Sequence, residues 1–465
     1  MVDRLTRSAT EAAEASEAAI VAHEAKFRSR LVAPHSTEKS MKLDSYWLDT
    51  APVFSEGAQG PVEGRADVVV IGGGFTGLSA ALELATRGVS VTVLEAGRIA
   101  SEASGRNGGQ CNTGVAQDFA SLAARVGLEQ ARGFYRAYES AVASVESIVS
   151  RHQIDCDLVR TGKLKLAAKP KHYEKLARTY EVLRREVDPE VELIPADRMR
   201  SEIGSDGFHG GLLQRNGVQM HMGKFGVGLA QAATRHGARI FEGAVVTQLK
   251  RIDGERYELT SARGVIRADR VLVATGASRV GPLQWFQQRM APVGSFIVVT
   301  EPLSTQQLDA FFPHRRSYVT SLNIGNYFRV TPDNRLLWGG RARFAMSNPH
   351  SDEKSGNVLR KGLAKYFPEL GNTRIDYCWG GLIDITVDRL PRAGQHEGLY
   401  YSMGYSGHGV QMSTHMGRMM ADMMSGSEQA NPWRSLPWPP VPGHAGRAWT
   451  LPLVGAYYRL QDILF

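Results

Sequence analysis

One stretch of sequence, residues 66–96, constrains the fold of this chain more than any other. It opens with a continuous apolar run from Val68 to Ile71, which is typical of a parallel strand buried on both faces. A helix-period pattern and a second apolar strand ending at Glu95 follow. Between the first strand and the helix lie three glycines spaced as G-x-G-x-x-G, namely Gly72, Gly74 and Gly77. This order predicts a dinucleotide-binding unit, the alternative being an ordinary strand–helix–strand unit with incidental glycines.

The spacing has a physical reason. The turn needs residues without a Cβ atom, and the backbone N–H groups at the start of a helix attract a pyrophosphate. Glu95 follows about twenty residues later, where a carboxylate can accept hydrogen bonds from a ribose. We also expect Phe75, Thr76 and Ala96 to contact the ligand, because they directly follow the turn and the carboxylate.

The composition is that of an ordinary globular protein. A length of 465 residues, with 43% apolar and 22% charged residues, predicts two domains. No apolar run approaches eighteen residues, and the sequence starts without a secretory pattern, so we expect no transmembrane helix and a cytoplasmic location. The three cysteines are widely separated, which predicts neither a metal site nor a redox dithiol.

The net charge of +8 raises the question of a nucleic-acid partner. The basic residues are dispersed and no nucleic-acid-binding module is recognisable, so we expect none. A positive field that attracts anionic substrates or cofactors explains the charge equally well. A flavin-containing protein that modifies or binds RNA remains the alternative from another functional class.

A second glycine-rich motif, SGRNGGQ, covers residues 104–110 directly after the Glu95 strand. Its small and polar residues exclude a regular element, but they allow backbone N–H groups to approach a flat ligand. A surface turn is the alternative. Farther along, helix patterns cover residues 117–150 and 170–188, and strand patterns dominate residues 245–274 and 291–345.

Five motifs together carry a resemblance to a known family: ADVVVIGGGFTGLSAALELA, EASGRNGGQ, VLVATGA, TPDNRLLWGG and YSMGYSGHGV. The chain resembles the flavin-dependent amine and amino-acid oxidases of the D-amino-acid oxidase and sarcosine oxidase superfamily. Within it, the chain is most similar to the gamma-glutamylputrescine and gamma-glutamylpolyamine oxidases. The resemblance covers about residues 41–465.

The resemblance implies an α/β fold. A Rossmann-type FAD-binding domain would be assembled from several segments, and a substrate domain would contain a mainly antiparallel sheet. The FAD-binding segments would be residues 41–115, 226–282 and 371–431, and the substrate segments 116–225 and 283–370. Residues 1–40 would form an N-terminal extension, and residues 432–465 a tail packing on the body.

The resemblance also implies the cofactor contacts. The first motif would hold the FAD pyrophosphate and ribose, and Val246 would meet the adenine. The SGRNGGQ loop would wrap the ribityl chain and the isoalloxazine edge through Ser104, Arg106, Asn107, Gly108, Gly109 and Gln110. Gly276 would pass near the pyrophosphate. The GYSGHG motif would offer backbone N–H groups to the flavin through Gly407, His408, Gly409, Val410 and Gln411. Taken by itself, His408 also fits a loop histidine, and we assign it as a cofactor contact and not as a general base.

Two departures from the sarcosine oxidase pattern matter. No cysteine stands near Gly381 to tether the flavin, so non-covalent FAD is predicted. The strand expected to carry a lysine that assists the reaction with oxygen offers Leu336, Leu337 and Trp338 instead. A dehydrogenase with another electron acceptor therefore stays open beside an oxidase.

The implied reaction is oxidation of a C–N bond in an amine by hydride transfer to the flavin. Oxygen would accept the electrons to give hydrogen peroxide, and hydrolysis would give an aldehyde and an amine or ammonia. For a gamma-glutamylated amine we expect Arg341 and Arg343 to hold the carboxylate, with Tyr327 and Trp338 beside the aliphatic chain. Exposed edge-strand arginines and core aromatics are the alternatives. The sequence assigns no catalytic residue, no metal and no oligomeric state.

Overall fold

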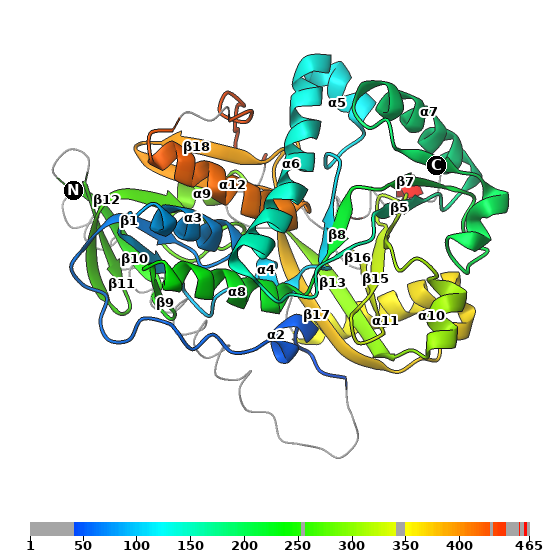
Figure 1. Ribbon diagram of the computed structural model, residues 1–465, viewed down its shortest axis with the longest axis horizontal. Coiled ribbons are helices and arrows are strands. Elements are labelled where there is room, and N and C mark those ends of the chain that lie inside the picture. The colour runs from blue at the N-terminus through cyan, green and yellow to red at the C-terminus, as the bar shows by residue number, and fades with distance from the viewer. Residues whose placement is uncertain are drawn as a thin grey trace, which may run out of the picture.

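The computed structural model describes residues 41–252, 256–340, 349–427, 431–442, 455 and 460–462. Within them the chain forms two large sheets that lie beside each other, each with its own helices (Figure 1). The predicted α/β fold is confirmed. The expected extension over residues 1–40 and the two candidate arginines, Arg341 and Arg343, lie outside the described residues.

The first sheet has eight strands, with the main order β10-β11-β12-β1-β2-β9. Its strands are β1 (Arg65–Ile71), β2 (Val91–Leu94), β9 (Arg239–Phe241), β10 (Val246–Ile252), β11 (Arg256–Ser261), β12 (Gly264–Val273), β18 (Arg392–His396) and β19 (Leu399–Met403). The centre is parallel, because β1 pairs in parallel with β12 and β2, and β2 with β9. The predicted order of strand, helix and strand over residues 66–96 is therefore present.

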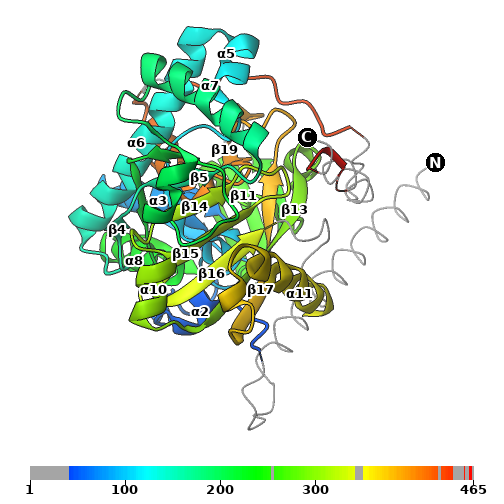
Figure 2. The same cartoon turned by 90° about the vertical axis from the view of Figure 1, so that its right-hand side faces the viewer.

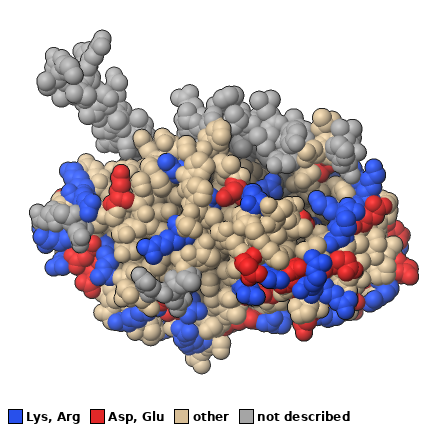
Figure 3. All heavy atoms as spheres, turned by 90° about the horizontal axis from the view of Figure 1, so that it is seen from above, with Lys and Arg blue, Asp and Glu red and all other residues tan. Residues whose placement is uncertain are grey.

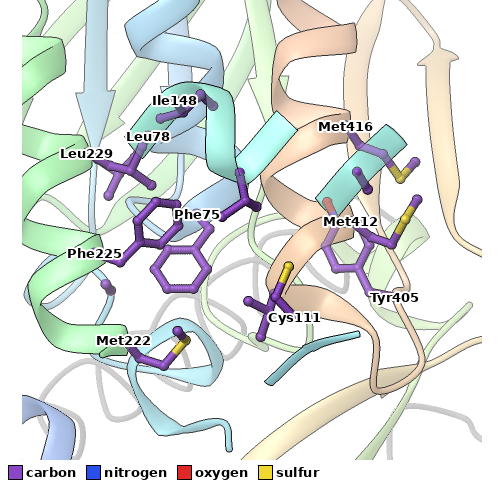
Figure 4. Packing of buried hydrophobic residues seen from close by; sticks show 14 of the residues in the cluster. Phe75, Leu78, Cys111, Ile148, Met222, Phe225, Leu229, Tyr405, Met412 and Met416 are labelled. Carbon is purple, nitrogen blue, oxygen red and sulfur yellow. The ribbon is translucent and has the colours of Figure 1, made fainter. Parts of the chain in front are cut away.

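Three helices stack over one face of this sheet: α3 (Phe75–Thr86), α8 (Met222–Arg235) and α12 (Gly409–Met424). Phe75 of α3 meets Phe225 of α8 at a ring-centroid distance of 5.1 Å (Figure 4). The buried side of α12 is rich in methionine, as Met412 and Met416 show in the same figure. This methionine-rich stretch is part of the core.

The second sheet also has eight strands, in the order β17-β13-β16-β15-β14-β5-β7-β6. They are β5 (Lys163–Leu166), β6 (Glu192–Ile194), β7 (Gly211–Gln214), β13 (Ala291–Pro302), β14 (Ser317–Thr320), β15 (Asn326–Val330), β16 (Arg335–Gly340) and β17 (Ile375–Ile385). All its pairs are antiparallel except β14 with β5, which agrees with the expected mainly antiparallel sheet. Helices α10 (Thr305–Phe311) and α11 (Pro349–Tyr366) lie beside the second sheet (Figure 2).

The remaining elements connect the two sheets. A small sheet joins β3 (Gln110–Asn112), β8 (Gly217–Gln219) and β4 (Val159–Arg160). The other helices are α2 (Tyr46–Thr50), α4 (Ala103–Arg106), α5 (Phe119–Val126), α6 (Leu128–His152), α7 (Pro170–Glu186), α9 (Gln284–Gln287), and the 3-10 turns η1 (Ala196–Ser201) and η2 (Pro368–Leu370). None of the helices within the described ranges is long and apolar enough to cross a membrane. On the face shown in Figure 3, basic and acidic side chains are interspersed and form no continuous basic patch.

One strand departs from the expected segments. Residues 371–431 were expected in the FAD-binding domain, yet β17, which begins this segment, pairs along its length with β13 of the second sheet. Its residues Cys378 to Gly380 are buried, so this edge strand of the second sheet contributes to the core there. The rest of the division into two domains stays a prediction.

The described part of the tail lies on the body. Trp433 is buried and stacks on Phe134, with ring centroids 6.1 Å apart. The Asp462 carboxylate accepts hydrogen bonds from the backbone N–H of Asn323 at 2.8 Å and of Ile324 at 2.7 Å.

We predict that Gly77→Ala destabilises the fold. A Cβ atom on Gly77 would lie 1.9 Å from the carbonyl oxygen of Gly72, so α3 would have to move away from β1. Overpacking of this kind costs about 1–3 kcal/mol. Gly133 of α6 is the matched control, because a Cβ atom there meets nothing within 4 Å. Alanine at this open helical position should stabilise by up to about 1 kcal/mol.

Urea unfolding of both variants measures the difference. The midpoint should fall for Gly77→Ala and stay or rise for Gly133→Ala. Equal midpoints for the two variants would show that α3 does not depend on the contact at Gly77.

Candidate functional site

A cavity of about 1430 Å³ opens where the two sheets meet. One wall contains the glycine turn after β1 and the start of α12, and the opposite wall contains β5, β14 and β15 of the second sheet. Sites for drug-sized ligands measure about 300–1,000 Å³, so this cavity has room for a dinucleotide and a second small molecule.

The glycine turn forms the floor of the cavity at the carboxyl end of β1. Gly72 has a φ of +109°, and a Cβ atom there would lie 2.7 Å from the carbonyl oxygen of Ala274. Helix α3 begins at Phe75, and its N-cap residue Gly74 has no side chain that could cap it. Both residues line the cavity, so the positive end of the helix dipole faces it. The Ser104 hydroxyl accepts a hydrogen bond from the Phe75 N–H at 3.1 Å. This floor suits a pyrophosphate.

Glu95 stands at the end of β2, as the sequence predicts. Its carboxylate accepts hydrogen bonds from the backbone N–H of Gly73 at 2.6 Å and of Gly97 at 2.8 Å. Burial raises the pKa of Glu95 to about 7, against the opposing effect of these two donors. A ribose hydroxyl that donates to this carboxylate would favour its ionised form.

The SGRNGGQ loop is held from behind by side chains of other elements. The indole N–H of Trp47 donates to the carbonyl oxygen of Asn107 at 2.7 Å, and that of Trp379 donates to the carbonyl oxygen of Arg106 at 3.0 Å. Arg106 is itself buried and donates to the carbonyl oxygen of Gly380 at 3.2 Å. Asn107 folds back onto the loop, since its Oδ1 accepts from the N–H of Gly109 at 2.8 Å. The expectation that these residues form no regular element is wrong at both ends of the motif, because Ser104 to Arg106 belong to α4 and Gln110 begins β3.

Arg329, which is not among the predicted site residues, fixes the last part of this loop. It is fully buried and donates to the carbonyl oxygens of Gly109 at 2.6 Å and Met220 at 2.9 Å. Burial lowers its pKa to about 9. The sequence does offer one signal for the role of Arg329. It is a charged residue in the buried half of the β15 strand, and a buried charge needs a partner.

The third part of the wall is the start of α12. His408 precedes this helix without a side-chain cap, so the first N–H groups of α12 open toward the cavity. Gln411 donates through Nε2 to the carbonyl oxygen of Asn112 at 2.5 Å. Its buried Oε1 has no hydrogen-bond partner among the residues that the structure describes. A polar ligand in the cavity would supply one.

The structure brings most of the predicted contacts together on this cavity. Lining it are Gly72, Gly74, Phe75, Thr76, Glu95, Ala96, Ser104, Arg106, Asn107, Gly108, Gln110, Val246, Gly276, Tyr327, Gly407, His408, Gly409, Val410 and Gln411.

Three predicted residues do not line the cavity. Gly77 packs against the backbone of Gly72. Gly109 belongs to the SGRNGGQ loop but packs against Arg329. Trp338 is fully buried in the core of the second sheet, where it stacks on Phe328 at 4.5 Å. The expectation that Trp338 contacts substrate is wrong, because its side of β16 faces the core and not the cavity.

Several lining residues are not among the predicted contacts. Asp384 lines the cavity, accepts from the N–H of Gly404 at 2.6 Å, and has a pKa raised to about 6 by burial. Tyr405 joins the two helix starts, because its hydroxyl lies 2.7 Å from the hydroxyl of Thr76. Lysines of β5 and α7 also line the cavity. Only the pairing of distant segments brings these residues to one site.

The family described as "FAD dependent oxidoreductase" matches residues 67–423. This chain belongs to that family. It is therefore an oxidoreductase that uses FAD, and the expected resemblance is confirmed. The glycine floor, the Glu95 carboxylate and the open start of α12 fit such a cofactor.

Relatives agree with this family, and solved structures that are 23% and 22% identical share the fold. The gamma-glutamylputrescine oxidoreductase of Escherichia coli is 34% identical over 86% of this chain and 93% of its own. The glycine oxidase of Geobacillus kaustophilus is 27% identical over 79% of this chain and 94% of its own. A crystal structure of that glycine oxidase covers 80% of this chain and 99% of its own with a TM-score of 0.66. The structure of L-proline dehydrogenase from P. horikoshii covers 79% and 95% with a TM-score of 0.65.

Replacing Glu95 by alanine should weaken FAD binding about ten- to hundredfold, because a charge-assisted hydrogen bond contributes about 1.5–3 kcal/mol. Titration of the apoprotein with FAD measures the change. Glu63→Ala is the control, since Glu63 is exposed and does not line the cavity. An unchanged affinity in Glu95→Ala would remove Glu95 from the ribose.

The pH dependence gives a second measurement of the same contact. With a pKa of about 7, Glu95 in the apoprotein binds a proton as the pH falls through this value. FAD affinity of the wild type should therefore fall on acidification, and the affinity of Glu95→Gln should change less.

We predict that the flavin is not covalently attached. Gly381 lines the cavity at the position expected to carry the tether, and glycine has no side chain that could form one. The space there is also tight, because a Cβ atom on Gly381 would lie 3.1 Å from the Cβ of Arg106. Acid precipitation should release all the yellow colour into the supernatant. Flavin absorbance that stays with the precipitated protein would contradict this.

Proposed function

We propose that this protein oxidises a C–N bond of an amine, specifically of a gamma-glutamylated polyamine or a related amino compound. Oxygen would accept the electrons and become hydrogen peroxide, and hydrolysis would release an aldehyde together with an amine or ammonia. The similarity to the E. coli gamma-glutamylputrescine oxidoreductase supports the substrate class. The free and buried cysteines agree with the cytoplasmic location that we propose.

The observation that carries this proposal is the continuity of the cavity. It runs from the predicted cofactor contacts to a face of the second sheet where Ser295 and Tyr327 meet, with their hydroxyls 2.9 Å apart. A Cβ atom on Gly108 would lie 2.7 Å from the Tyr327 ring, so this tyrosine borders the SGRNGGQ loop. A substrate beside Tyr327 would thus lie next to the loop that is expected to hold the flavin edge.

Bound FAD would supply the chemistry by accepting a hydride from the carbon next to the amine nitrogen. The chain contributes orientation and electrostatics. The start of α12 directs its positive end into the cavity, where it would stabilise negative charge. Cations of β5 and α7 on the opposite wall disfavour a protonated amine, and the neutral amine is the reactive form.

A dehydrogenase that uses another acceptor is the second candidate. Leu337 and Trp338 stand in the strand where a lysine was expected to assist the reaction with oxygen, and Trp338 is buried. Peroxide release distinguishes the two candidates, because a dehydrogenase would reduce a dye without consuming oxygen.

The decisive experiment is anaerobic mixing of the FAD-loaded protein with gamma-glutamylputrescine, followed by addition of oxygen. We expect bleaching of the flavin absorbance and then its return with an equal amount of peroxide. Bleaching that only a dye reverses would select the dehydrogenase. Absence of bleaching with both gamma-glutamylputrescine and putrescine would contradict amine oxidation.

A further inference from the structure

The second-sheet wall of the cavity carries a group of cations that no cofactor contact requires. Lys163 and Lys165 lie on β5, and helix α7 adds three cations at the helical spacing i, i+4, i+7, namely Lys171, Lys175 and Arg178. Within the described ranges, none of the five forms a salt bridge with a carboxylate. The carboxylate of Asp118 lines the same region, where it interacts electrostatically with Lys165 and Lys175 and accepts hydrogen bonds from Ser121 N–H at 2.9 Å and Thr179 Oγ1 at 3.2 Å.

These cations differ in burial, because Lys163 is half-buried whereas Lys165, Lys171, Lys175 and Arg178 are exposed to the cavity. Burial lowers the pKa of Lys163 to about 7, and its ammonium donates to the carbonyl oxygen of Thr113 at 2.8 Å. The pKa of Lys165 is lowered by the protein that surrounds the cavity and by the nearby Lys175, and the Asp118 carboxylate opposes this shift. An anion entering this end of the cavity would offset the repulsion of Lys165 with Lys163 and with Lys175.

The sheet register places Lys165 at a fixed distance from the region where the reaction is proposed. Lys165 pairs with Val319, and Val319 pairs with Tyr327. Directly paired residues point to the same face, and all three line the cavity. Adjacent strands lie about 4.7–4.9 Å apart, so two spacings separate Lys165 from Tyr327 by roughly 10 Å.

We propose that Lys165, together with Lys175, binds a carboxylate at the end of the substrate remote from the oxidised C–N bond. The site then selects elongated amino compounds over α-amino acids. This inference rests on the proposed function, because that function places the reacting amine beside Tyr327.

Chain length supports this selection. In gamma-glutamylputrescine, nine bonds separate the reacting carbon from the α-carboxylate carbon. An extended chain spans about 3.3–3.6 Å for every three bonds, so nine bonds reach about 10–11 Å. The amine and carboxylate of an α-amino acid are separated by two bonds and cannot occupy both positions.

Binding of glutarate, a dicarboxylate without an amine, tests the anion site without any oxidation. Isothermal titration calorimetry on the FAD-loaded enzyme should show binding to the wild type, weakened about ten- to hundredfold in Lys165→Gln and in Lys175→Gln. Lys250→Gln is the control, because Lys250 is exposed on β10 and does not line the cavity. It should leave the affinity unchanged. No glutarate binding to the wild type, or equal binding by Lys165→Gln, overturns the proposal.

Kinetics of flavin reduction test the position of the carboxylate relative to the amine. Lys165→Gln should raise KM for gamma-glutamylputrescine about ten- to hundredfold, and by far more than it changes KM for putrescine. Glycine should be a far poorer substrate than gamma-glutamylputrescine. Equal effects on both amines, or a preference for glycine, overturn the remote carboxylate. If no amine reduces the flavin, the proposed function fails, while glutarate binding still decides whether the anion site exists.

Discussion

The close approach of α3 to β1 is the constraint on which the site depends. The carbonyl oxygen of Gly72 occupies the space that any side chain at position 77 would need. Glycine is equally necessary where α12 crosses α3, because a Cβ atom on Gly417 would lie 2.5 Å from the carbonyl oxygen of Thr76. These contacts bring the starts of α3 and α12 to the same edge of the sheet, where Tyr405 joins them. Two positive helix ends thus converge on one cavity.

The cofactor half of the site could be predicted from sequence because its contacts are local. The glycine turn and Glu95 lie within one strand–helix–strand unit, whose geometry depends on residues close in the chain. The SGRNGGQ loop was recognisable for the same reason. What fixes this loop was not, because Trp47 and Arg329 reach it from distant segments.

The substrate half depends on pairings between segments far apart, which explains the errors there. β17 was placed with the wrong domain because an apolar strand pattern does not say which sheet it joins. Trp338 is predicted in the pocket but lies in the core. Its strand β16 is buried on both faces, so the sequence does not show which face lines the cavity. The lysines of β5 were missed since their alternation with Leu164 and Leu166 resembles an ordinary half-exposed strand.

The methionine face of α12 would limit the working life of the enzyme if the proposed reaction with oxygen releases peroxide. Thioether sulfur is readily oxidised to a sulfoxide, which is polar and disrupts a core. Met412, Met416 and Met420 are fully buried, so the native packing shields them although the helix begins at the cavity. Oxidative damage to them would require the helix to open first. The lifetime during turnover would then be set by how often α12 separates from α3, and transient unfolding would become permanent inactivation.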